Sequence, residues 1–554
     1  MCWTTEPWPP HCGRAGPDET DPMTLSRRAL IHLVGEAGGV AAAYRTMAAM
    51  GLLAVPEAYA GAPALPPGRG RRIVIIGAGI AGMVIALELE KAGYAPLILE
   101  ARKRPGGRNW SLRAGDTVQE TDSVQHVSWD SGPHLYFNPG PARIPYHHNG
   151  ILSYCRELGV ALEVMCNENR GALMQDDAAF DGAPQSNRRV VSDTRGYVAE
   201  LAAKAVDQAA LDGPVTATDK ERLRAFLRAF GALDRDLTYH GSDRAGWAES
   251  PGGGLESGKP NSPLDLRAIL ASEFWRGPMQ FGEFADMSAT MLQPVGGMGR
   301  IGEAFGRRLR RRIVLGAEVT ELRRTPGGAR VIWRDKHGAR RTTEAPIVVV
   351  TVPLTVLREI SADFAPEVSQ AIAAVGYVPA GKVAFQAERR FWELDHRIYG
   401  GISWTSRNIT QIWYPTAGIN QSKGVLLGGY IWSQDLGEAF AAKSPAQRLD
   451  DALADGERVH PGYRRWLGKG IAVAWKKIPF SLSAWAEWTK AARTTHYPTL
   501  LAGDGPFLFA GEHMSWITGW QEGAVRSAHV GLQEIARRTA PAHSPTLQAM
   551  HGSS

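Results

Sequence analysis

The sequence of 554 residues predicts an α/β fold, α+β overall, on three observations. An apolar run leads into a glycine-rich turn, a helical pattern and a second apolar run within residues 71–100. Largely helical, polar-faced segments follow over residues 151–291, and alternating, strand-like runs return over residues 380–435. A buried strand and a long helix end the pattern at residues 507–538. Together they predict a Rossmann-type dinucleotide-binding domain, a second domain with a mixed sheet, and an inserted helical subdomain.

The first of these units carries Gly77-Ala78-Gly79-Ile80-Ala81-Gly82 between a strand and a helix. Gly77 allows a tight turn, Gly79 lets a pyrophosphate approach the backbone, and Gly82 lets the helix pack closely on the strand. The phosphates are expected at the helix N-terminus, where free N–H groups and the helix dipole favour negative charge. Such a glycine motif alone is weak, but here the strand, the helix and a terminal acid are in register, which predicts dinucleotide binding.

That terminal acid is Glu100, at the end of the second strand. A carboxylate there can accept hydrogen bonds from the hydroxyls of an adenosine ribose, whereas it would repel a 2′-phosphate. The sequence therefore disfavours NADP as the dinucleotide.

Composition describes an ordinary globular protein, with 44% hydrophobic and 21% charged residues and a formal charge of +6. The length predicts two or three domains. The densest basic run, residues 307–312, is expected to be a solvated helix face leading into a strand, and no nucleic-acid partner is predicted. No stretch is long and apolar enough to be an ordinary membrane-spanning helix, so no integral membrane segment is expected.

The four cysteines are Cys2, Cys12, Cys155 and Cys166. Their spacing matches neither a disulfide framework nor a zinc site, so no metal is predicted. We expect Cys155 and Cys166 to be buried free thiols.

The N-terminal region allows two interpretations. Residues 24–30 resemble a twin-arginine export signal, and Ala58-Tyr59-Ala60 has the small-x-small form of a cleavage site. However, Glu36 and Arg45 interrupt the apolar part, which also fits an amphipathic helix packed on the body of the protein. The sequence does not decide between export and a cytoplasmic location.

Taken together, separated segments resemble the flavin-containing amine oxidase family over roughly residues 70–540. The segments are Gly77–Glu100 with Gly106-Gly107-Arg108, Gln293–Gly299, Val314–Leu322, and Phe509–His513 with Gly519–Ala524. Each alone could be a loop or a packed strand, but their joint occurrence in this order is typical of the family.

The resemblance implies FAD as the cofactor. In the family, the residue matching Arg108 reaches the pyrophosphate, the backbone at Val319 contacts adenine, and the acid matching Glu512 binds the ribityl chain. The predicted cofactor-binding residues are Gly77, Ala78, Gly79, Ala81, Gly82, Glu100, Ala101, Arg102, Gly107, Arg108, Ala142, Arg143, Val319, Trp475, Gly511, Glu512, Gly519, Trp520 and Ala524.

Within the family, residues 138–145 are most similar to bacterial L-amino acid oxidases, in which the arginine matching Arg143 pairs with the substrate carboxylate. A guanidinium presents a planar fork that fits a carboxylate bidentately. The alternative is that Arg143 pairs with an acid of the protein itself. Tyr414 resembles the tyrosine that donates to the same carboxylate, although an alignment slip of one residue would exchange it with Trp413, which points to the opposite face of a strand.

Three further residues are predicted to serve catalysis. Lys382 resembles the family lysine that holds a water near flavin N5, and the alternative is a lysine on an exposed strand face. Trp520 is expected to wall the site, and Gly519 to offer its carbonyl to the substrate amine. Four histidines lie near these motifs without matching a general base: His134, His147, His148 and His513.

The resemblance implies this division of the chain: a leader at 1–69; FAD-binding parts at 70–145, 292–345 and 496–540; a mostly helical insert at 146–291; a substrate-binding domain with antiparallel strands at 346–495; and a flexible tail at 541–554.

The implied reaction is hydride transfer from Cα of an L-amino acid with a neutral amine. The imino acid then hydrolyses to a 2-oxo acid and ammonia, and dioxygen is reduced to hydrogen peroxide. The predicted partners are thus an L-amino acid and dioxygen. Alternatives are an amino-acid 2-monooxygenase that yields an amide, an amine oxidase of another substrate class, and a silent flavoprotein. The preferred side chain is not determined, nor is the oligomeric state, although a homodimer is common among relatives.

Overall fold

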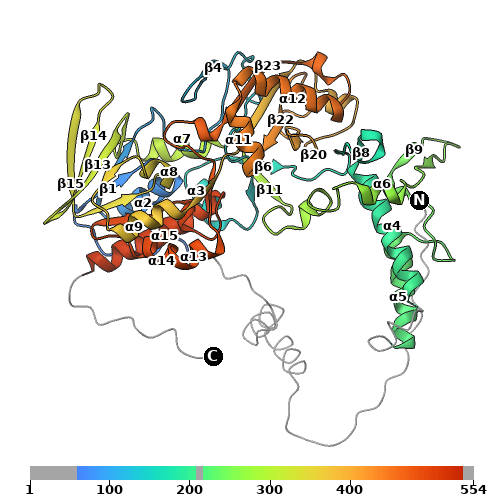
Figure 1. Cartoon of the computed structure of the whole chain (residues 1–554), viewed down its shortest axis with the longest axis horizontal. Helices are drawn as coiled ribbons and strands as arrows, with labels where there is room; N and C mark the ends of the chain where they lie inside the picture. Colours follow the sequence, from blue (N-terminus) through green and yellow to red (C-terminus); the bar gives the residue numbers. More distant parts are fainter. Residues whose placement is uncertain (1–58, 207–215, 541–554) are drawn as a thin grey trace, which may run out of the picture. The chain divides into compact units, whose positions relative to one another are not determined.

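The structure is a computed structural model that describes residues 59–206 and 216–540 (Figure 1). Most of the predicted leader, with Cys2 and Cys12, and the predicted tail lie outside the described residues. From Gly61 onward the described residues belong to one compact unit.

The predicted strand–helix–strand unit is present as β1 (Arg72–Ile76), α2 (Ile80–Lys91) and β2 (Ala95–Glu100). β1 and β2 pair in parallel, as a crossover through one helix requires. Gly77, between β1 and α2, has a φ of +100°, which an L side chain rarely adopts. A Cβ on Gly82 would collide with the Gly77 carbonyl oxygen, so this glycine permits the close helix–strand packing that the motif predicts.

A five-stranded parallel sheet is built around this unit, in the order β12 (Ile313–Leu315), β2, β1, β16 (Ile347–Val350) and β25 (Phe507–Phe509). β16 consists of four buried apolar residues, as expected of a strand covered on both faces. The predicted boundary at residue 346 assigns β16 to the substrate-binding domain, which is wrong by one strand. Its pairing puts β16 in the middle of the parallel sheet, between β1 and β25.

The two faces of this sheet have separate cores. Ile73 and Ile75 face one core, while Val74 and Ile76 face the other, because alternate residues of a strand point to opposite sides. The first core contains α2, α3 (Asn149–Glu157), α7 (Gly299–Arg308) and α15 (Gln521–Thr539). The second contains a four-stranded sheet, in the order β15 (Arg340–Ala345), β14 (Gly328–Arg334), β13 (Glu318–Thr325) and β17 (Ser361–Ala362), with α8 (Leu354–Leu357), α9 (Pro366–Ala374) and α14 (Tyr497–Ala502).

The predicted mixed sheet has seven strands, in the order β23 (Leu467–Ala474), β19 (Gly381–Ala387), β22 (Gly424–Ile431), β21 (Gln411–Trp413), β20 (Ile402–Thr405), β7 (Leu173–Gln175) and β8 (Gln185–Ser186). Among these described strands, β20 and β7 pair in parallel and the other neighbours are antiparallel. One face packs beneath α11 (Gln434–Ala442) and α12 (Pro445–Val459). The other face contributes to the core on the side of the cavity described below.

The segment 146–291 is less helical than the sequence predicts. Its described α-helices are α3, α4 (Asn187–Ala205), α5 (Ala217–Gly231) and α6 (Leu266–Ala271), but β7 and β8 join the seven-stranded sheet. β6 (Leu162–Met165) forms a small sheet with β11 (Met291–Pro294) and β5 (Ile144–Pro145). The remaining elements are β3 (Thr117–Gln119), β4 (Val124–His126), β9 (Trp247–Glu249), β10 (Lys259–Pro260), β18 (Gly376–Val378), β24 (Trp485–Glu487), α10 (Phe391–Leu394), α13 (Lys490–Thr495) and short 3₁₀ turns.

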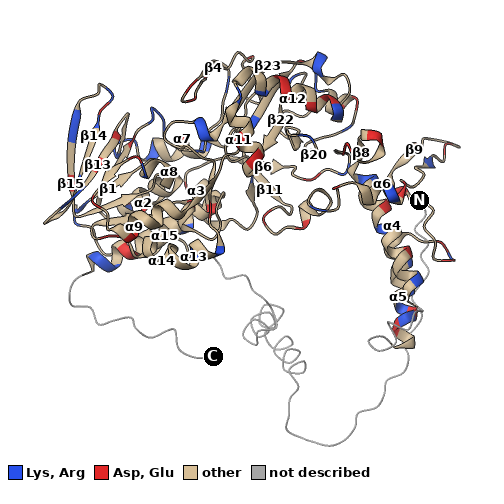
Figure 2. Cartoon of the chain, in the orientation of Figure 1, with Lys and Arg blue, Asp and Glu red and all other residues tan. Residues whose placement is uncertain are grey.

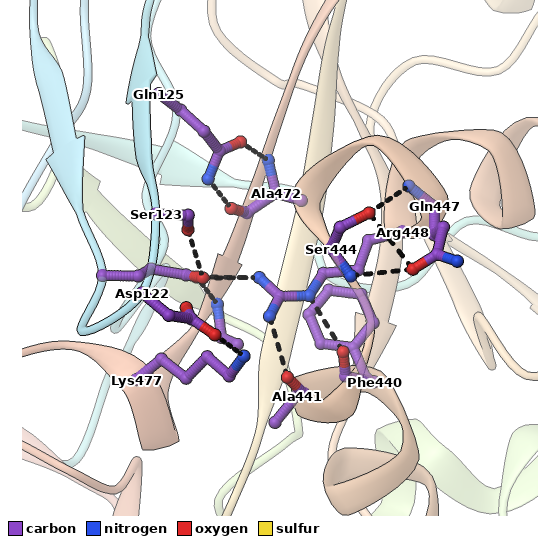
Figure 3. A network of polar contacts seen from close by, with 12 residues as sticks. Asp122, Ser123, Gln125, Phe440, Ala441, Ser444, Gln447, Arg448, Ala472 and Lys477 are labelled. Carbon is purple, nitrogen blue, oxygen red and sulfur yellow. Dashed lines mark hydrogen bonds and ion pairs between the residues drawn. The ribbon is translucent and has the colours of Figure 1, made fainter.

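A fully buried ion pair joins segments that lie far apart in the sequence (Figure 3). Nη1 of Arg448, on α12, donates to both carboxylate oxygens of Glu120 at 2.8 Å. Nε and Nη2 of Arg448 donate to the carbonyls of Phe440 and Ala441, and Glu120 also accepts from the amide of Ala474. This network fixes the β3–β4 hairpin against β23 and the α11–α12 connection.

Charged residues of both signs are interspersed over most elements in Figure 2, including α4 and α5. Part of the basic run at 307–312 has structural partners, since Arg308 and Arg312 both pair with Glu90 of α2. Cys155 and Cys166 are free thiols; Cys155 is buried as predicted, whereas Cys166 is partly exposed. No helix of the described residues has the length and apolarity to cross a membrane.

Candidate active site

One cavity of about 530 Å³ brings together the two ends of the described chain. Gly77 and Gly79 line it beside Glu512 and Trp520. The sheet order explains this meeting, because β1 and β25 are separated only by β16. The predicted residues that line the cavity are Gly77, Gly79, Ala81, Glu100, Ala101, Arg102, Gly107, Arg108, Val319, Lys382, Trp475, Gly511, Glu512, Gly519, Trp520 and Ala524.

The carboxylate of Glu100, which lines the cavity, is held by two backbone amides. Ala78 N–H donates to Oε2 at 2.7 Å and Arg102 N–H donates to Oε1 at 2.8 Å. An ionised carboxylate has about four lone-pair sites, so these bonds orient the group and leave capacity for ribose hydroxyls. A Cβ on Gly79 would meet nothing within 4 Å, so its backbone is accessible from the cavity. These features fit the nucleotide half of a dinucleotide.

Glu512, which also lines the cavity, connects three segments that are separated in the sequence. Its Oε1 accepts from Arg108 Nη1 at 2.9 Å and from the amide of Ala486 at 3.2 Å, and its Oε2 accepts from the amide of Gly519 at 3.0 Å. Trp520, which precedes the first turn of α15, lines the same wall. The N-terminus of α15 therefore opens onto the cavity, where its free N–H groups favour negative charge.

Arg143 lies beside Trp520 but is not itself one of the residues that line the cavity. It is 9% exposed and has no acidic partner among the described residues. Its Nη2 donates to Met287 Sδ at 2.8 Å, and its Nε has no hydrogen-bond partner in this part of the chain. Burial lowers the pKa of Arg143 to about 10. The alternative that Arg143 pairs with an acid of the protein is therefore wrong for the described residues. A buried guanidinium without an acid is strongly destabilised unless an anion joins it.

Aromatic rings surround that guanidinium. Its central carbon lies 4.6 Å from the ring centroid of Trp413, 5.5 Å from that of Phe281 and 5.6 Å from that of Trp520. Such faces stabilise the cation, while they offer no hydrogen-bond acceptor to compete with a ligand.

Lys382, on β19, is 4% exposed and also lacks an acidic partner within residues 59–206 and 216–540. Its Nζ donates to the carbonyls of Gly140 at 2.6 Å and Asn138 at 3.2 Å, and lies 4.7 Å from the ring centroid of Tyr430. Burial first, and then the nearby charge of Arg143, lowers the pKa of Lys382 to about 7. The alternative of a lysine on an exposed strand face is wrong, since Lys382 lines the cavity.

The prediction that Tyr414 faces Arg143 is wrong. Tyr414 belongs to the core on the far side of the seven-stranded sheet, where its hydroxyl is bonded at 2.6 Å to Ser403 Oγ and at 2.6 Å to His460 Nε2. Its neighbour Trp413 faces Arg143, as the alternative register requires. Consecutive strand residues point to opposite faces of the sheet, so an alignment shifted by one residue assigns a core side chain to the active site.

The tyrosine that does line the cavity is Tyr430, which the sequence interpretation missed. It stands directly opposite Lys382 in the β19–β22 register. The sequence could have indicated this contact, because pairing the strands that carry Lys382 and Tyr430 as neighbours puts these two residues opposite each other.

Four predicted cofactor residues do not line the cavity: Ala78, Gly82, Ala142 and Arg143. Ala78 supports the cavity through its backbone amide, which donates to Glu100. Gly82 supports it by allowing α2 to pack closely against the glycine turn. Ala142 is partly buried against the core beside the cavity.

In agreement with this geometry, the sequence of residues 80–530 matches the model of the family described as flavin containing amine oxidoreductase. The chain belongs to this family. The cofactor of this flavin-containing oxidoreductase is FAD, in agreement with the strand–helix–strand unit and its Glu100. The residues present fit the group, since open glycine backbone, an oriented carboxylate and a helix N-terminus line one continuous cavity.

Similar proteins include an L-amino-acid oxidase from Siganus canaliculatus, 28% identical over 84% of this chain and 85% of that protein. The flavin-dependent L-tryptophan oxidase RebO from Lentzea aerocolonigenes is 27% identical over 84% of this chain and 98% of that protein. Among solved structures, cyclohexylamine oxidase from Brevibacterium oxydans IH-35A has a TM-score of 0.55 at 17% identity, covering 86% of this chain and 99% of that one. A structure of putrescine oxidase also has a TM-score of 0.55, at 18% identity, with 84% and 99% covered. These likenesses support the amine oxidoreductase fold.

Proposed function

We propose that this amine oxidoreductase is an FAD-dependent L-amino acid oxidase, which converts L-amino acids to 2-oxo acids with release of ammonia and hydrogen peroxide. The observation that carries the proposal is the buried guanidinium of Arg143 beside the flavin cavity, which no acid of the described residues neutralises. A simple amine brings no anion to such a site, whereas the carboxylate of an amino acid does. Relatives named L-amino-acid oxidase and L-tryptophan oxidase support the same substrate class.

Each residue has a proposed task. Arg143 holds the substrate carboxylate through parallel N–H donors, and Tyr430 adds its hydroxyl from β22. Positioning of this kind aligns Cα with the cofactor without proton transfer by the protein. Trp520 and Trp413 exclude water and favour large apolar or aromatic side chains. The chemistry supplied by bound FAD is hydride acceptance from Cα and reoxidation by dioxygen. Lys382 is proposed to hold a water for that second step.

FAD contacts are proposed residue by residue. Glu100 receives the adenosine ribose and Val319 the adenine. Arg108 and the amides near Gly79 hold the pyrophosphate, and Glu512 holds the ribityl chain. All of these line the cavity.

The test compares an L-amino acid with the amine that lacks only its carboxylate, such as L-tryptophan with tryptamine, in a peroxide assay. We expect the holoenzyme to prefer the amino acid strongly, and Arg143→Met to lower kcat/KM for the amino acid about 10²–10³-fold while hardly affecting the amine. Equal use of both substrates by the unaltered enzyme would reject the proposal. Recovery of an amide in place of the 2-oxo acid would identify the protein as a monooxygenase instead.

A further inference from the structure

Two histidines and an aspartate converge beside Trp520, one of the residues that line the cavity. His147 Nε2 lies 2.9 Å from Asp286 Oδ1, and His148 Nε2 lies 3.2 Å from the same oxygen. The three ligand atoms all lie within 4.8 Å of one another. Tetrahedral Zn²⁺, with bonds of about 2.0–2.1 Å, needs ligand atoms about 3.3–3.4 Å apart. The observed spacing requires little movement to reach that geometry.

The backbone builds this cluster from distant segments. Asp286 is 138 residues from His148, so no local motif reveals the group. β5 ends at Pro145, which pairs with Met291 of β11, and the amide of Tyr146 donates to the carbonyl of Thr290. These two connections hold the turn with the histidines against the turn with Asp286.

The cluster combines rigidity with access. His148 is 2% exposed and precedes α3 as its N-cap, and its ring packs edge-on against Trp520 with centroids 5.1 Å apart. His147 and Asp286 are 35% and 41% exposed, so an ion and its water ligands can reach the group from solvent. A second grouping, of Asp234, Asp236 and His240, is exposed throughout and lacks such a buried, fixed member.

We propose that His147, His148 and Asp286 bind a divalent transition-metal ion of the Zn²⁺ class, with water in the open position. Two imidazoles and one carboxylate are ligands that suit such ions.

The site is coupled to substrate binding through Met287. This residue follows Asp286 directly and accepts a hydrogen bond from Arg143 Nη2. A carboxylate bound bidentately needs the Nη2 donor of Arg143 that now bonds Met287. The Met287 side chain must therefore move away when the substrate binds. A metal ion that fixes Asp286 restrains Met287 against Arg143 and therefore raises the KM for the amino acid. This second statement rests on the proposed function, whereas metal binding does not.

The experiment titrates the holoenzyme with Zn²⁺ alone, in competition with a chromophoric chelator. We expect one tight site per chain, at least tenfold weakened in His147→Ala and in Asp286→Asn. The matched control His240→Ala, in the exposed grouping, should bind as the unaltered protein does. Because His147 and Asp286 are partly exposed, both variants should retain FAD absorbance, which verifies folding. Equal affinity in all four proteins, or no site in the unaltered one, would overturn the assignment.

A second measurement addresses the coupling. Saturating Zn²⁺ should raise the KM for an L-amino acid severalfold in the unaltered enzyme and leave it unchanged in Asp286→Asn. Chelator-measured binding with an unchanged KM would refute the coupling. Absence of any oxidase activity would refute the proposed function and not the metal site, since the titration needs no turnover.

Discussion

Lys382 and Tyr430 face each other across the β19–β22 pair, with the lysine nitrogen 4.7 Å from the centre of the phenol ring. This cross-strand contact brings a buried cation and a hydroxyl-bearing ring to the same wall of the flavin cavity. It also corrects the choice of tyrosine, since Tyr414 lies on the opposite side of the sheet.

The two tyrosines should respond differently to loss of the hydroxyl. Tyr430→Phe should raise the KM for an L-amino acid about tenfold with a small effect on stability, because one hydrogen bond to the carboxylate is lost. Tyr414→Phe should leave the kinetics unchanged and lower the free energy of unfolding by about 1–2 kcal/mol, since Ser403 and His460 lose a buried partner. Steady-state kinetics and denaturant unfolding of both variants check this. The reverse assignment of effects would restore Tyr414 to the site.

Lys382 should control the reaction of the reduced enzyme with dioxygen. Its pKa of about 7 means that the ammonium is present below pH 7 and is lost above it. We expect the rate of reoxidation to fall as pH rises through about 7, and Lys382→Met to slow that step at least tenfold while changing substrate reduction less. Stopped-flow absorbance separates the two half-reactions. A reoxidation rate in Lys382→Met equal to that of the unaltered enzyme would remove the lysine from this role.

The same lysine affects stability in a defined pH window. Its pKa is about 7 in the folded protein and 10.5 as the ordinary value, so the unfolded chain binds more protons between these limits. The free energy of unfolding therefore rises as pH rises from about 7 to 10.5. Below pH 7 the buried lysine is charged in the folded protein, and its destabilising effect is then at its maximum. We expect Lys382→Met to raise Tm at pH 6 and to show a smaller gain at pH 9. A gain that is constant with pH would contradict the assigned pKa.

Breaking the buried ion pair should be costly although it lies outside the cavity. Arg448→Met leaves the Glu120 carboxylate buried without its cation, which is expected to cost about 3–5 kcal/mol. As a control, Lys443→Met breaks an exposed pair with Asp451, and a change below about 1 kcal/mol is expected. Thermal unfolding measures both. Similar losses in the two variants would show that burial does not set the strength of the effect.

Gly82 should be required for cofactor retention. Gly82→Ala puts a methyl group against the Gly77 carbonyl and 2.9 Å from Thr351 Oγ1, so α2 must shift away from the glycine turn. We expect reduced FAD content in the purified protein, read from the ratio of flavin to protein absorbance. Gly468→Ala is the matched control, since a Cβ there meets nothing within 4 Å. Full FAD content in Gly82→Ala would contradict the packing argument.

How far the sequence predicts the structure differs between its parts. The strand–helix–strand unit, β25 and α15 were predictable because their motifs are local and each element is continuous in sequence. The sheet to which β16 belongs could not be predicted, because the apolar sequence of a strand does not specify which strands it pairs with. The same limit explains Tyr414 and Trp413, whose faces depend on a register that only pairing with β20 and β22 defines.

Within the site, residue type was easier to predict than environment. Arg143 could be proposed from its motif, but its lack of an acidic partner among the described residues depends on every segment packed around it. Met287, Phe281 and the histidine–aspartate group come from the insert, where no periodic pattern marks them. Such contacts arise from tertiary packing and leave no trace in local sequence.

The parallel sheet has a further consequence for biosynthesis. Residues that follow β25, from Gly511 to Ala524, line one side of the cofactor cavity and are translated long after the glycine turn. A nascent chain presents the glycine turn long before Glu512 and Trp520 exist. FAD is therefore expected to bind only after residue 524 has been added, and a chain truncated before residue 507 is expected to lack bound flavin.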